Sequence, residues 1–275
     1  MINSQRIQAM FGLKWNPFLP DVPPEALYKA KFIADFCWRV EHIVLDGGFT
    51  LITGDPGVGK STTLRFVVQH LAAIPELSVK SIALPKCSLR DFYRQLAHLY
   101  GVDISVSNRY GNFNKLRENW LSQIKNKYFR PVLIIDEAQD MLPDVLLELR
   151  ILGSTDFDSR CILGIVLAGD RRLTEKLNTA QLLPLMSRMR AQLVVEETNS
   201  TDLADILRHA TELAGNPELM TPGLRKTIVD NSMGNPRTMM HLANEVLAVA
   251  AQKGEKILTE EIYLELFKPA LRRKR

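Results

Sequence analysis

Short runs of apolar and β-branched residues alternate with stretches of helical period through the first two thirds of the chain. Each run is nearly continuous in apolar residues, as expected for parallel strands whose sheet is covered on both faces. The runs are Phe49–Thr53, Val79–Leu84, Val132–Ile135, Ile162–Leu167 and Leu193–Val195. The helical stretches between them are Lys60–Ala72, Ser88–Leu99, Asn114–Asn126, Asp144–Leu152 and Arg172–Leu177. The pattern predicts an α/β domain with a parallel five-stranded sheet flanked by helices.

The regions on either side of this pattern differ from it. The proline-rich stretch Trp15–Pro24 predicts an extended segment. Helical spacing then runs from Tyr28 to Leu45 through Phe32, Phe36, Val40 and Val44. After Val195 only helices are expected, over Thr201–Ala214, Pro222–Asn231, Pro236–Lys253 and Thr259–Leu266. We therefore expect an N-terminal segment (1–26), a core (27–198), a small C-terminal helical lid domain (199–267) and a basic tail (268–275), with Leu271–Arg275 disordered.

Composition adds few constraints. Of 275 residues, 46% are hydrophobic and 24% charged, which is typical of a globular protein, and the net charge of +4 permits nucleic-acid binding without requiring it. The sequence has neither an apolar run of membrane-spanning length nor a signal-peptide pattern, so we expect no membrane association. Cys37, Cys87 and Cys161 are scattered, which favours reduced thiols and a cytoplasmic location.

A phosphate-binding loop follows the first predicted strand and opens the next helix. Its residues are Gly54, Asp55, Pro56, Gly57, Val58, Gly59, Lys60 and Ser61, which fit GxxxxGK[ST]. Glycines allow successive backbone N–H groups to point into one concavity, and the helix N-terminus adds partial positive charge there. Lys60 would bind the terminal phosphates and Ser61 would bind magnesium, while Thr62 offers a second hydroxyl near the nucleotide. A chance match is the alternative, and the strand–loop–helix context disfavours it.

Two acids end the third predicted strand. Asp136 and Glu137 follow the apolar run Val132–Ile135, so a buried strand would deliver them to the edge where ligands bind in parallel sheets. We expect Asp136 to hold magnesium through its water shell and Glu137 to polarise the water that attacks the γ-phosphate. Without the phosphate loop upstream, the simpler interpretation of the pair would be two solvated acids at the end of a strand. Gln139 and Asp140 would only cap the next helix.

Two further polar positions lie where they could touch a nucleotide. Asp170 closes the fourth predicted strand and could sense the γ-phosphate, but its negative charge makes a turn or helix-cap role equally acceptable. Arg237 follows Pro236, a residue suited to the first turn of a helix. Arg237 would reach the nucleotide from the helical domain or remain a solvated surface arginine.

Two arginines precede the last predicted strand and could serve a neighbouring subunit. Arg188, and after it Arg190, are candidates for a finger that stabilises the charge of the transferring phosphoryl group. The alternative is a surface salt bridge. If the first role holds, Arg188→Ala leaves nucleotide binding intact and abolishes turnover.

Taken together, these motifs resemble the AAA+ superfamily of P-loop ATPases. More narrowly, the chain resembles the ExeA-type branch that includes the transposition ATPases TniB and TnsC. The motifs that carry the resemblance are Phe11-Gly12-Leu13, Asn16-Pro17-Phe18, the phosphate loop, Ile134–Gln139, Leu147–Leu152, Leu167–Asp170 and Gly234–Arg237. Members of this branch often have Gln where Asp170 stands, which weakens the sensor assignment.

The resemblance implies a function as well as a fold. It implies an ATP- and Mg²⁺-dependent ATPase that forms a homo-oligomeric ring or helical filament on double-stranded DNA. Such an assembly recruits a transposase, possibly through a target-selection adaptor, and hydrolysis takes it apart. ExeA itself continues into a membrane span and a cell-wall-binding region, and neither is present in this sequence, which favours the transposition regulators.

The resemblance also points to less specific contacts. Lys86 and Arg90 follow the second predicted strand, a region that lines the central channel of related assemblies, and would contact DNA phosphates or simply be solvated. Asn16 and Phe18 would contact the adenine base or pack against the helical domain. Two other functions remain open: a secretion-associated ATPase, and a signalling or defence switch that binds ATP and rarely hydrolyses it.

Overall fold

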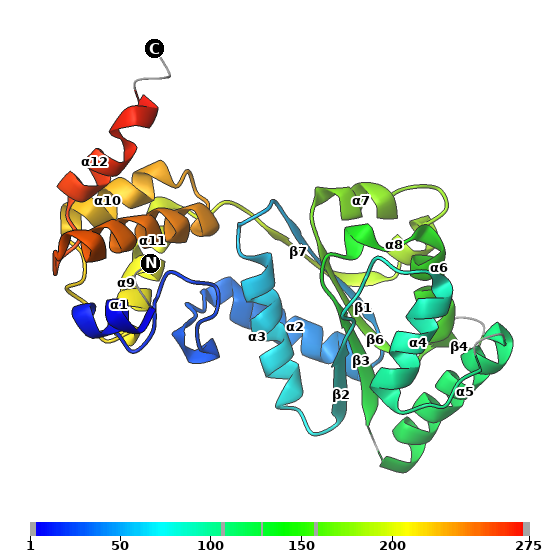
Figure 1. Cartoon of the computed structure of the whole chain (residues 1–275). Coiled ribbons are helices and arrows are strands. Elements are labelled where there is room, and N and C mark those ends of the chain that lie inside the picture. The colour runs from blue at the N-terminus through cyan, green and yellow to red at the C-terminus, as the bar shows by residue number, and fades with distance from the viewer. Residues whose placement is uncertain (1–3, 106–107, 128, 157–158, 272–275) are drawn as a thin grey trace. The chain divides into compact units, whose positions relative to one another are not determined.

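A computed structural model describes residues 4–105, 108–127, 129–156 and 159–271 (Figure 1). These residues fall into two compact units. The core unit comprises Lys29–Pro56 and Lys60–Val195, and the helical unit comprises the described residues up to Tyr28, those from Glu196 onward, and Gly57–Gly59. Residues 272–275, most of the tail expected to be disordered, lie outside the described residues.

The core unit is built on a parallel sheet in the order β2-β3-β6-β1-β7. Its strands are β1 (Phe49–Gly54), β2 (Leu77–Ser81), β3 (Arg130–Ile135), β6 (Gly164–Gly169) and β7 (Met189–Val195). Since all neighbouring strands are parallel, the chain must cross from one end of the sheet to the other between them, and helices make most of these connections. β6 lies between β1 and β3, so the carboxyl ends of these three strands lie at one edge of the sheet.

Helices cover both faces of this sheet (Figure 1). They are α2 (Lys31–Leu45), α3 (Lys60–Ala72), α4 (Leu89–Tyr100), α5 (Arg109–Ser122), α6 (Pro143–Gly153), α7 (Arg171–Leu177) and α8 (Leu183–Met186). Alternate strand residues such as Leu51, Leu133 and Leu167 join the buried cluster formed with α4–α8. Their neighbours, such as Ile52 and Ile134, point to the opposite face, which α2 and α3 cover, and are equally buried. The five-stranded parallel sheet predicted from the apolar runs is therefore confirmed.

The helical unit gathers both ends of the chain. Its helices are α1 (Ser4–Phe11), the 3₁₀ turn η1 (Pro24–Ala26), α9 (Ser200–Leu213), α10 (Pro222–Asn231), α11 (Pro236–Lys253) and α12 (Glu260–Leu271). Phe11 and Leu13 are buried in the same cluster as Leu207 and Val246. The N-terminal segment is thus part of this unit, not the separate segment 1–26 that the sequence predicted. Proline content marked only the stretch after Phe11, so α1 was missed.

Several predicted boundaries were wrong. β2 ends at Ser81 instead of Leu84, and β7 begins at Met189 instead of Leu193, so Arg190 lies within a strand. α5 begins five residues before Asn114 and is followed by the π-helical turn η2 (Gln123–Lys127). Other unpredicted elements are η3 (Ala138–Asp140), α8 and the antiparallel pair β4 (Ser154–Thr155) and β5 (Arg160–Cys161). These elements are too short to show a hydrophobic period.

Candidate nucleotide-binding site

The phosphate loop lies between β1, which ends at Gly54, and α3, which begins at Lys60. Gly57 and Gly59 have φ angles of 87° and 110°, values that an L side chain rarely adopts, so glycine is required at both positions. Lys60 is only 8% exposed, and its Nζ donates a hydrogen bond to the carbonyl oxygen of Asp55 at 2.9 Å. A largely buried ammonium with one carbonyl partner is ready to bind an anion. Ser61 is exposed and Thr62 is half-buried beside it.

Asp136 follows β3 and lies beside residues of the phosphate loop. Burial raises the pKa of its carboxyl, and the negative charge of Glu137 raises it further. The Glu137 N–H, which donates to Asp136 Oδ1 at 2.9 Å, the Lys60 ammonium and the Ser61 hydroxyl oppose this pKa rise. Asp136 follows β3, and Lys60 and Ser61 begin the helix that follows β1. The fold therefore brings these three residues together although β6 separates the two strands.

The donor set of this site fits magnesium. The Ser61 hydroxyl and an Asp136 carboxylate oxygen are hard oxygen ligands, which Mg²⁺ prefers, and they interact with each other. Among the described residues, no group of three or more His, Cys, Asp or Glu side chains could hold a metal ion. Two protein ligands would therefore need phosphate and water oxygens to complete the coordination of the ion.

Glu137 is exposed and adopts a left-handed backbone conformation, with φ 51° and ψ 38°. For a residue with a side chain this conformation costs on the order of 1–3 kcal/mol, and such residues concentrate at ligand sites. The turn directs the chain away from β3 into η3. The Glu137 side chain is consequently held at the edge where the carboxyl ends of β1, β3 and β6 meet.

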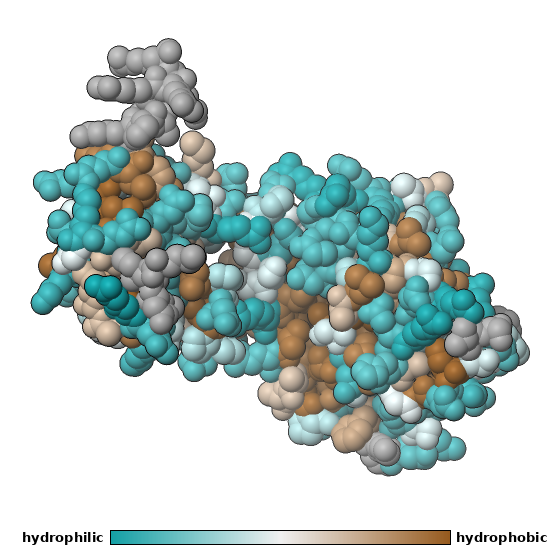
Figure 2. Space-filling view, in the orientation of Figure 1, coloured by the Kyte–Doolittle hydropathy of each residue, from teal (hydrophilic) through white to brown (hydrophobic). Residues whose placement is uncertain are grey.

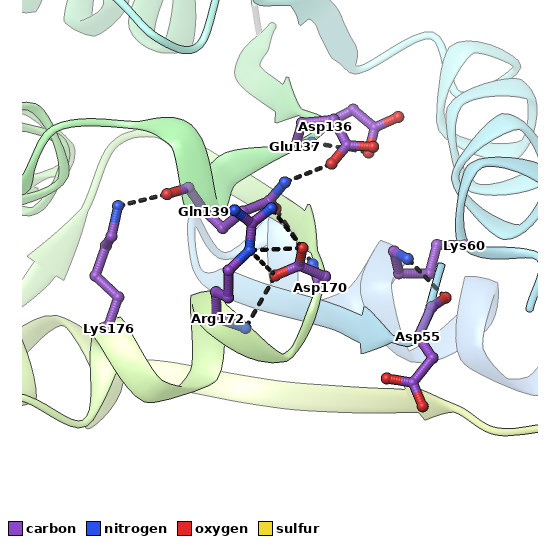
Figure 3. Close-up of polar contacts among 8 residues, drawn as sticks. All are labelled: Asp55, Lys60, Asp136, Glu137, Gln139, Asp170, Arg172 and Lys176. Carbon is purple, nitrogen blue, oxygen red and sulfur yellow. Dashed lines mark hydrogen bonds and ion pairs between the residues drawn. The ribbon is translucent and has the colours of Figure 1, made fainter. Parts of the chain in front are cut away.

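Gln139 has a role that the sequence did not suggest. Its Nε2 donates to Glu137 Oε2 at 2.5 Å, and its Oε1 accepts the Asp170 N–H at 3.2 Å (Figure 3). The predicted capping role was wrong: the N-cap of α6 is Leu142, with no side-chain bond, and Pro143 begins the helix. The sequence showed only that a polar residue stands two positions after Glu137. That spacing did not indicate which groups its side chain contacts.

Asp170 caps α7 and pairs with Arg172. Its carboxylate accepts the Arg172 N–H at 2.9 Å and forms an ion pair with the guanidinium at 2.7 Å. Hydrogen bonding from the Arg172 side chain lowers the Asp170 pKa below its usual range. The capping role that the sequence left open is therefore present, and the γ-phosphate sensor role stays a prediction.

The start of α7 also reaches the phosphate loop. Arg171, whose side chain is 77% exposed, pairs with Asp55 at 2.5 Å. Figure 2 shows that the surface in the region of α7 is largely hydrophilic. The exposed guanidinium groups of Arg171 and Arg172 thus lie close to the loop and to Asp170, two contacts that the sequence did not predict.

Arg188 and Arg190 lie at the other end of the sheet. Met189, between them, is in register with Phe49, the first residue of β1, whereas the phosphate loop follows its last residue. Five residues of strand span roughly 16 Å, so these arginines are remote from the phosphate site of their own chain. Arg188 is half-buried and Arg190 is exposed. Their finger role stays a prediction.

The remaining nucleotide candidates belong to the helical unit. Arg237 is exposed in the first turn of α11, which begins at Pro236 as expected, with Asn235 as a side-chain N-cap. Phe18 is 4% exposed within the helical core, and Asn16 bonds both Asn244 and the Phe18 N–H. The packing alternative for Asn16 and Phe18 is therefore what the structure shows, and their base contacts stay a prediction.

The DNA candidates lie near the start of α4. Lys86 is exposed in the loop after β2, and Arg90 is exposed in the first turn of α4. Arg90 lines a cavity of about 320 Å³ together with Arg94 and Arg109. Arg109 also pairs with the buried Glu148 at 2.5 Å. Arg94 likewise pairs with Asp91 at 2.9 Å, so a phosphate bound in this cavity would compete with two carboxylates for these arginines.

Comparisons with known proteins agree with this geometry. Residues 44–177 match the family model described as "AAA domain". The chain is 28% identical over 264 residues to the general secretion pathway protein A of Aeromonas hydrophila, an alignment that covers 94% of this chain and 47% of the relative. The chain thus spans about half the length of the curated relative it matches.

Solved structures share the fold at low sequence identity. The Aeropyrum pernix ORC2 protein in ADPNP-ADP complexes is 16% identical with a TM-score of 0.71, covering 91% of this chain and 70% of that one. Drosophila ORC bound to DNA is 18% identical with a TM-score of 0.72, covering 95% and 65%. The fold of the chain is therefore the AAA+ P-loop fold. Within the described part of the chain, no helix is both long and apolar enough to cross a bilayer.

Proposed function

We propose that this protein is an ATP-hydrolysing AAA+ switch that assembles on double-stranded DNA and regulates transposition by recruiting or activating a transposase. The observation that carries the ATPase part is the meeting of Lys60, Ser61 and Asp136 at one edge of the sheet, with Glu137 beside them. The transposition part rests on the motif resemblance. The fold shared with Drosophila ORC, which was solved bound to DNA, is compatible with it.

The residues of one chain would supply the groups that bind ATP and activate the attacking water. The loop N–H groups and Lys60 would bind the phosphates, while Ser61 and Asp136 would hold magnesium, which would supply positive charge near the phosphate oxygens. Glu137 accepts a proton from water as the water oxygen bonds to the γ-phosphorus and the bond to the ADP oxygen breaks. The left-handed turn at Glu137 supports this role, because it leaves the carboxylate exposed at the strand ends.

A neighbouring subunit would complete the site. Arg188 and Arg190 lie at the amino end of β1, too far from the phosphate loop of the same chain to touch a nucleotide there. A second copy of the chain could bring one of these guanidinium groups to the γ-phosphate. This supports a homo-oligomer, either a closed ring or a helical filament.

Duplex DNA would bind through phosphates. Lys86 and Arg90 are exposed, and the cavity beside Arg90 carries two further arginines. Contacts of this kind provide affinity without sequence preference, which suits a protein that marks target DNA. A separate adaptor would then supply target selection.

The proposal is tested by imaging the protein with duplex DNA and a slowly hydrolysed ATP analogue. We expect DNA-dependent rings or filaments at low salt, with affinity that falls steeply as salt rises. Arg90→Ala should weaken DNA binding and flatten its salt dependence, and Arg208→Ala, which removes a surface arginine paired with Asp205, is the control. Absence of DNA-dependent assembly at low salt would overturn the DNA role while leaving the ATPase role intact.

A secretion-associated ATPase is the second candidate function. It is favoured by the alignment with the general secretion pathway protein A, which covers 94% of this chain. Both functions use the same nucleotide site, so ATP hydrolysis does not separate them. Oligomerisation that responds to ATP and ignores duplex DNA would favour the second candidate, and a neighbouring transposase gene would favour the first.

A further inference from the structure

A buried amide connects the acid at the end of β3 to the end of β6. We infer that Gln139 is a positioning residue that holds the Glu137 carboxylate for catalysis and ties its position to the end of β6. The inference rests on the ATP hydrolysis proposed above. Gln139 is 5% exposed, and both polar atoms of its side chain are bonded, one to Glu137 and the other to the Asp170 N–H (Figure 3).

The chemistry of the two partners sets the orientation of this amide. The Asp170 N–H is only a donor, so it must face the Gln139 carbonyl oxygen, at 3.2 Å. The Gln139 NH₂ group therefore points to Glu137, whose ionised carboxylate only accepts hydrogen bonds. Flipping the amide would place donor against donor and acceptor against acceptor. One orientation is thus strongly preferred, and it directs a donor at the proposed general base.

Gly169, the last residue of β6, provides the space for this contact. A Cβ at Gly169 would lie 2.5 Å from Gln139 Oε1 and 2.8 Å from Leu173 Cδ2. The φ angle of Gly169 is not in the left-handed region, so close approach, and not backbone conformation, explains the glycine. The missing Cβ therefore leaves room at the end of β6 for both the Gln139 amide and the Leu173 side chain.

The backbone of η3 also bonds to α7, the helix that follows β6. Lys176, on α7, donates its Nζ to the carbonyl oxygens of Gln139 and Met141, the latter at 2.8 Å. Both the main chain and the side chain of Gln139 are therefore anchored to the β6–α7 region. Glu137, two residues earlier and exposed, is connected through Gln139 to a strand other than its own.

The consequence for catalysis is geometric. A general base must lie within hydrogen-bond reach of the proton it accepts, and small displacements cost large factors in rate. A long exposed carboxylate has several accessible rotamers, and a single donor from a buried amide selects among them. A shift of the β6 end, where Asp170 and Arg172 lie, would move Gln139 and with it the Glu137 carboxylate.

Two substitutions test this role. Gln139→Met keeps the length of the side chain and removes both hydrogen bonds. We expect kcat to fall by about tenfold or more, with affinity for ATP changed by less than about twofold, because only the placement of the base is lost. Asp140→Asn, on an exposed position of the same turn, is the control and should leave kcat unchanged.

Gln139→Glu adds a readout that a merely structural role would not produce. When ionised, the introduced carboxylate accepts the Asp170 N–H but cannot donate to Glu137, and the two carboxylates repel. Protonation restores the donor, so the ratio of the variant's kcat to that of the wild type should rise as pH falls from about 8 to about 6. The change should appear in kcat and not in ATP affinity.

The outcomes separate this inference from the proposed function. Wild-type kcat in Gln139→Met, a pH-independent ratio in Gln139→Glu, or loss of ATP affinity in step with kcat would each overturn the positioning role. Wild-type protein that binds ATP and never hydrolyses it would overturn both proposals. Hydrolysis in the wild type, reduced kcat in Gln139→Met and a ratio that rises at low pH would support both.

Discussion

The two ends of the parallel sheet differ in how they hold their charged residues. At the carboxyl end, Lys60 is 8% exposed and bonded to its own loop, Asp136 is half-buried beside it, and Gln139 is 5% exposed. At the amino end of β1, Arg190 is exposed and Arg188 half-buried. One end is a compact, mutually bonded site, and the other presents cations roughly 16 Å from it.

The contrast indicates which steps one chain could carry out alone. Burial and opposite charges at the carboxyl end organise the site that we propose to bind ATP and activate water. The two arginines proposed to stabilise the phosphoryl charge during transfer, Arg188 and Arg190, lie instead at the far end of β1. Binding should therefore depend on one chain, and turnover on two.

The largest effect is expected from Lys60→Ala, which removes the central charge of the carboxyl end. ATP binding and hydrolysis should both become undetectable, because the phosphates lose their ammonium partner. Nucleotide titration and phosphate-release assays measure the two. Lys80→Ala, on β2, is a control that should leave both unchanged. Normal binding by Lys60→Ala would show that the loop does not hold the phosphates.

Arg188→Ala should separate ATP binding, assigned to the carboxyl end of the sheet, from turnover, which needs an arginine of the amino end. ATP affinity should be retained, while kcat falls on the order of a thousandfold. Mixing Arg188→Ala with Glu137→Gln should restore part of the activity, because some interfaces then combine an intact site with an intact finger. Arg190→Ala is the matched variant for the second candidate. If mixtures show only the summed activities of the separate variants, the arginine does not act across subunits.

Gly169→Ala should disturb the carboxyl end without touching a charged group. The new Cβ would press on Gln139 and Leu173, and overpacking of this kind costs about 1–3 kcal/mol of unfolding free energy. Turnover should fall with it, because Gln139 is displaced. Denaturant unfolding and phosphate release measure both. Gly153→Ala is the control, since its Cβ would meet Phe49 at a milder 3.3 Å.

Asp136→Asn is expected to have the smallest effect. Unlike Gly169→Ala, it should increase the stability of the protein. Burial raises the Asp136 pKa, so between the unfolded and folded pKa values the folded state binds more protons, and stability falls as pH rises. Without nucleotide, Asn should stabilise the protein slightly at neutral pH and flatten this pH dependence, because no buried carboxylate then has to ionise. Thermal melting from about pH 4 to 8 tests this. Lower stability of the variant at pH 7 would contradict it.

Much of the fold followed from local patterns. The apolar runs predicted every strand of the main sheet, because parallel strands buried on both faces are continuously apolar. The helix Lys60–Ala72 was predicted with the boundaries observed. Phe32 shows the limit: it shares the helical spacing of Phe36, yet it is 48% exposed while Phe36 is fully buried. Periodicity locates a helix more reliably than it tells which residues at the edge of the apolar face are covered.

The order of residues along the chain was enough to predict the groups that lie close together in sequence. These are the glycines, Lys60 and Ser61 in one loop, and the two acids after one strand. Which groups remote in sequence come together depends on the fold. The strand order places β6 between β1 and β3, and so brings the Asp170 N–H and Gly169 to Gln139. It also assigns the arginines to the opposite end of β1. Spacing along the chain cannot encode these distances, because they arise from strand pairing between segments that are remote in the sequence.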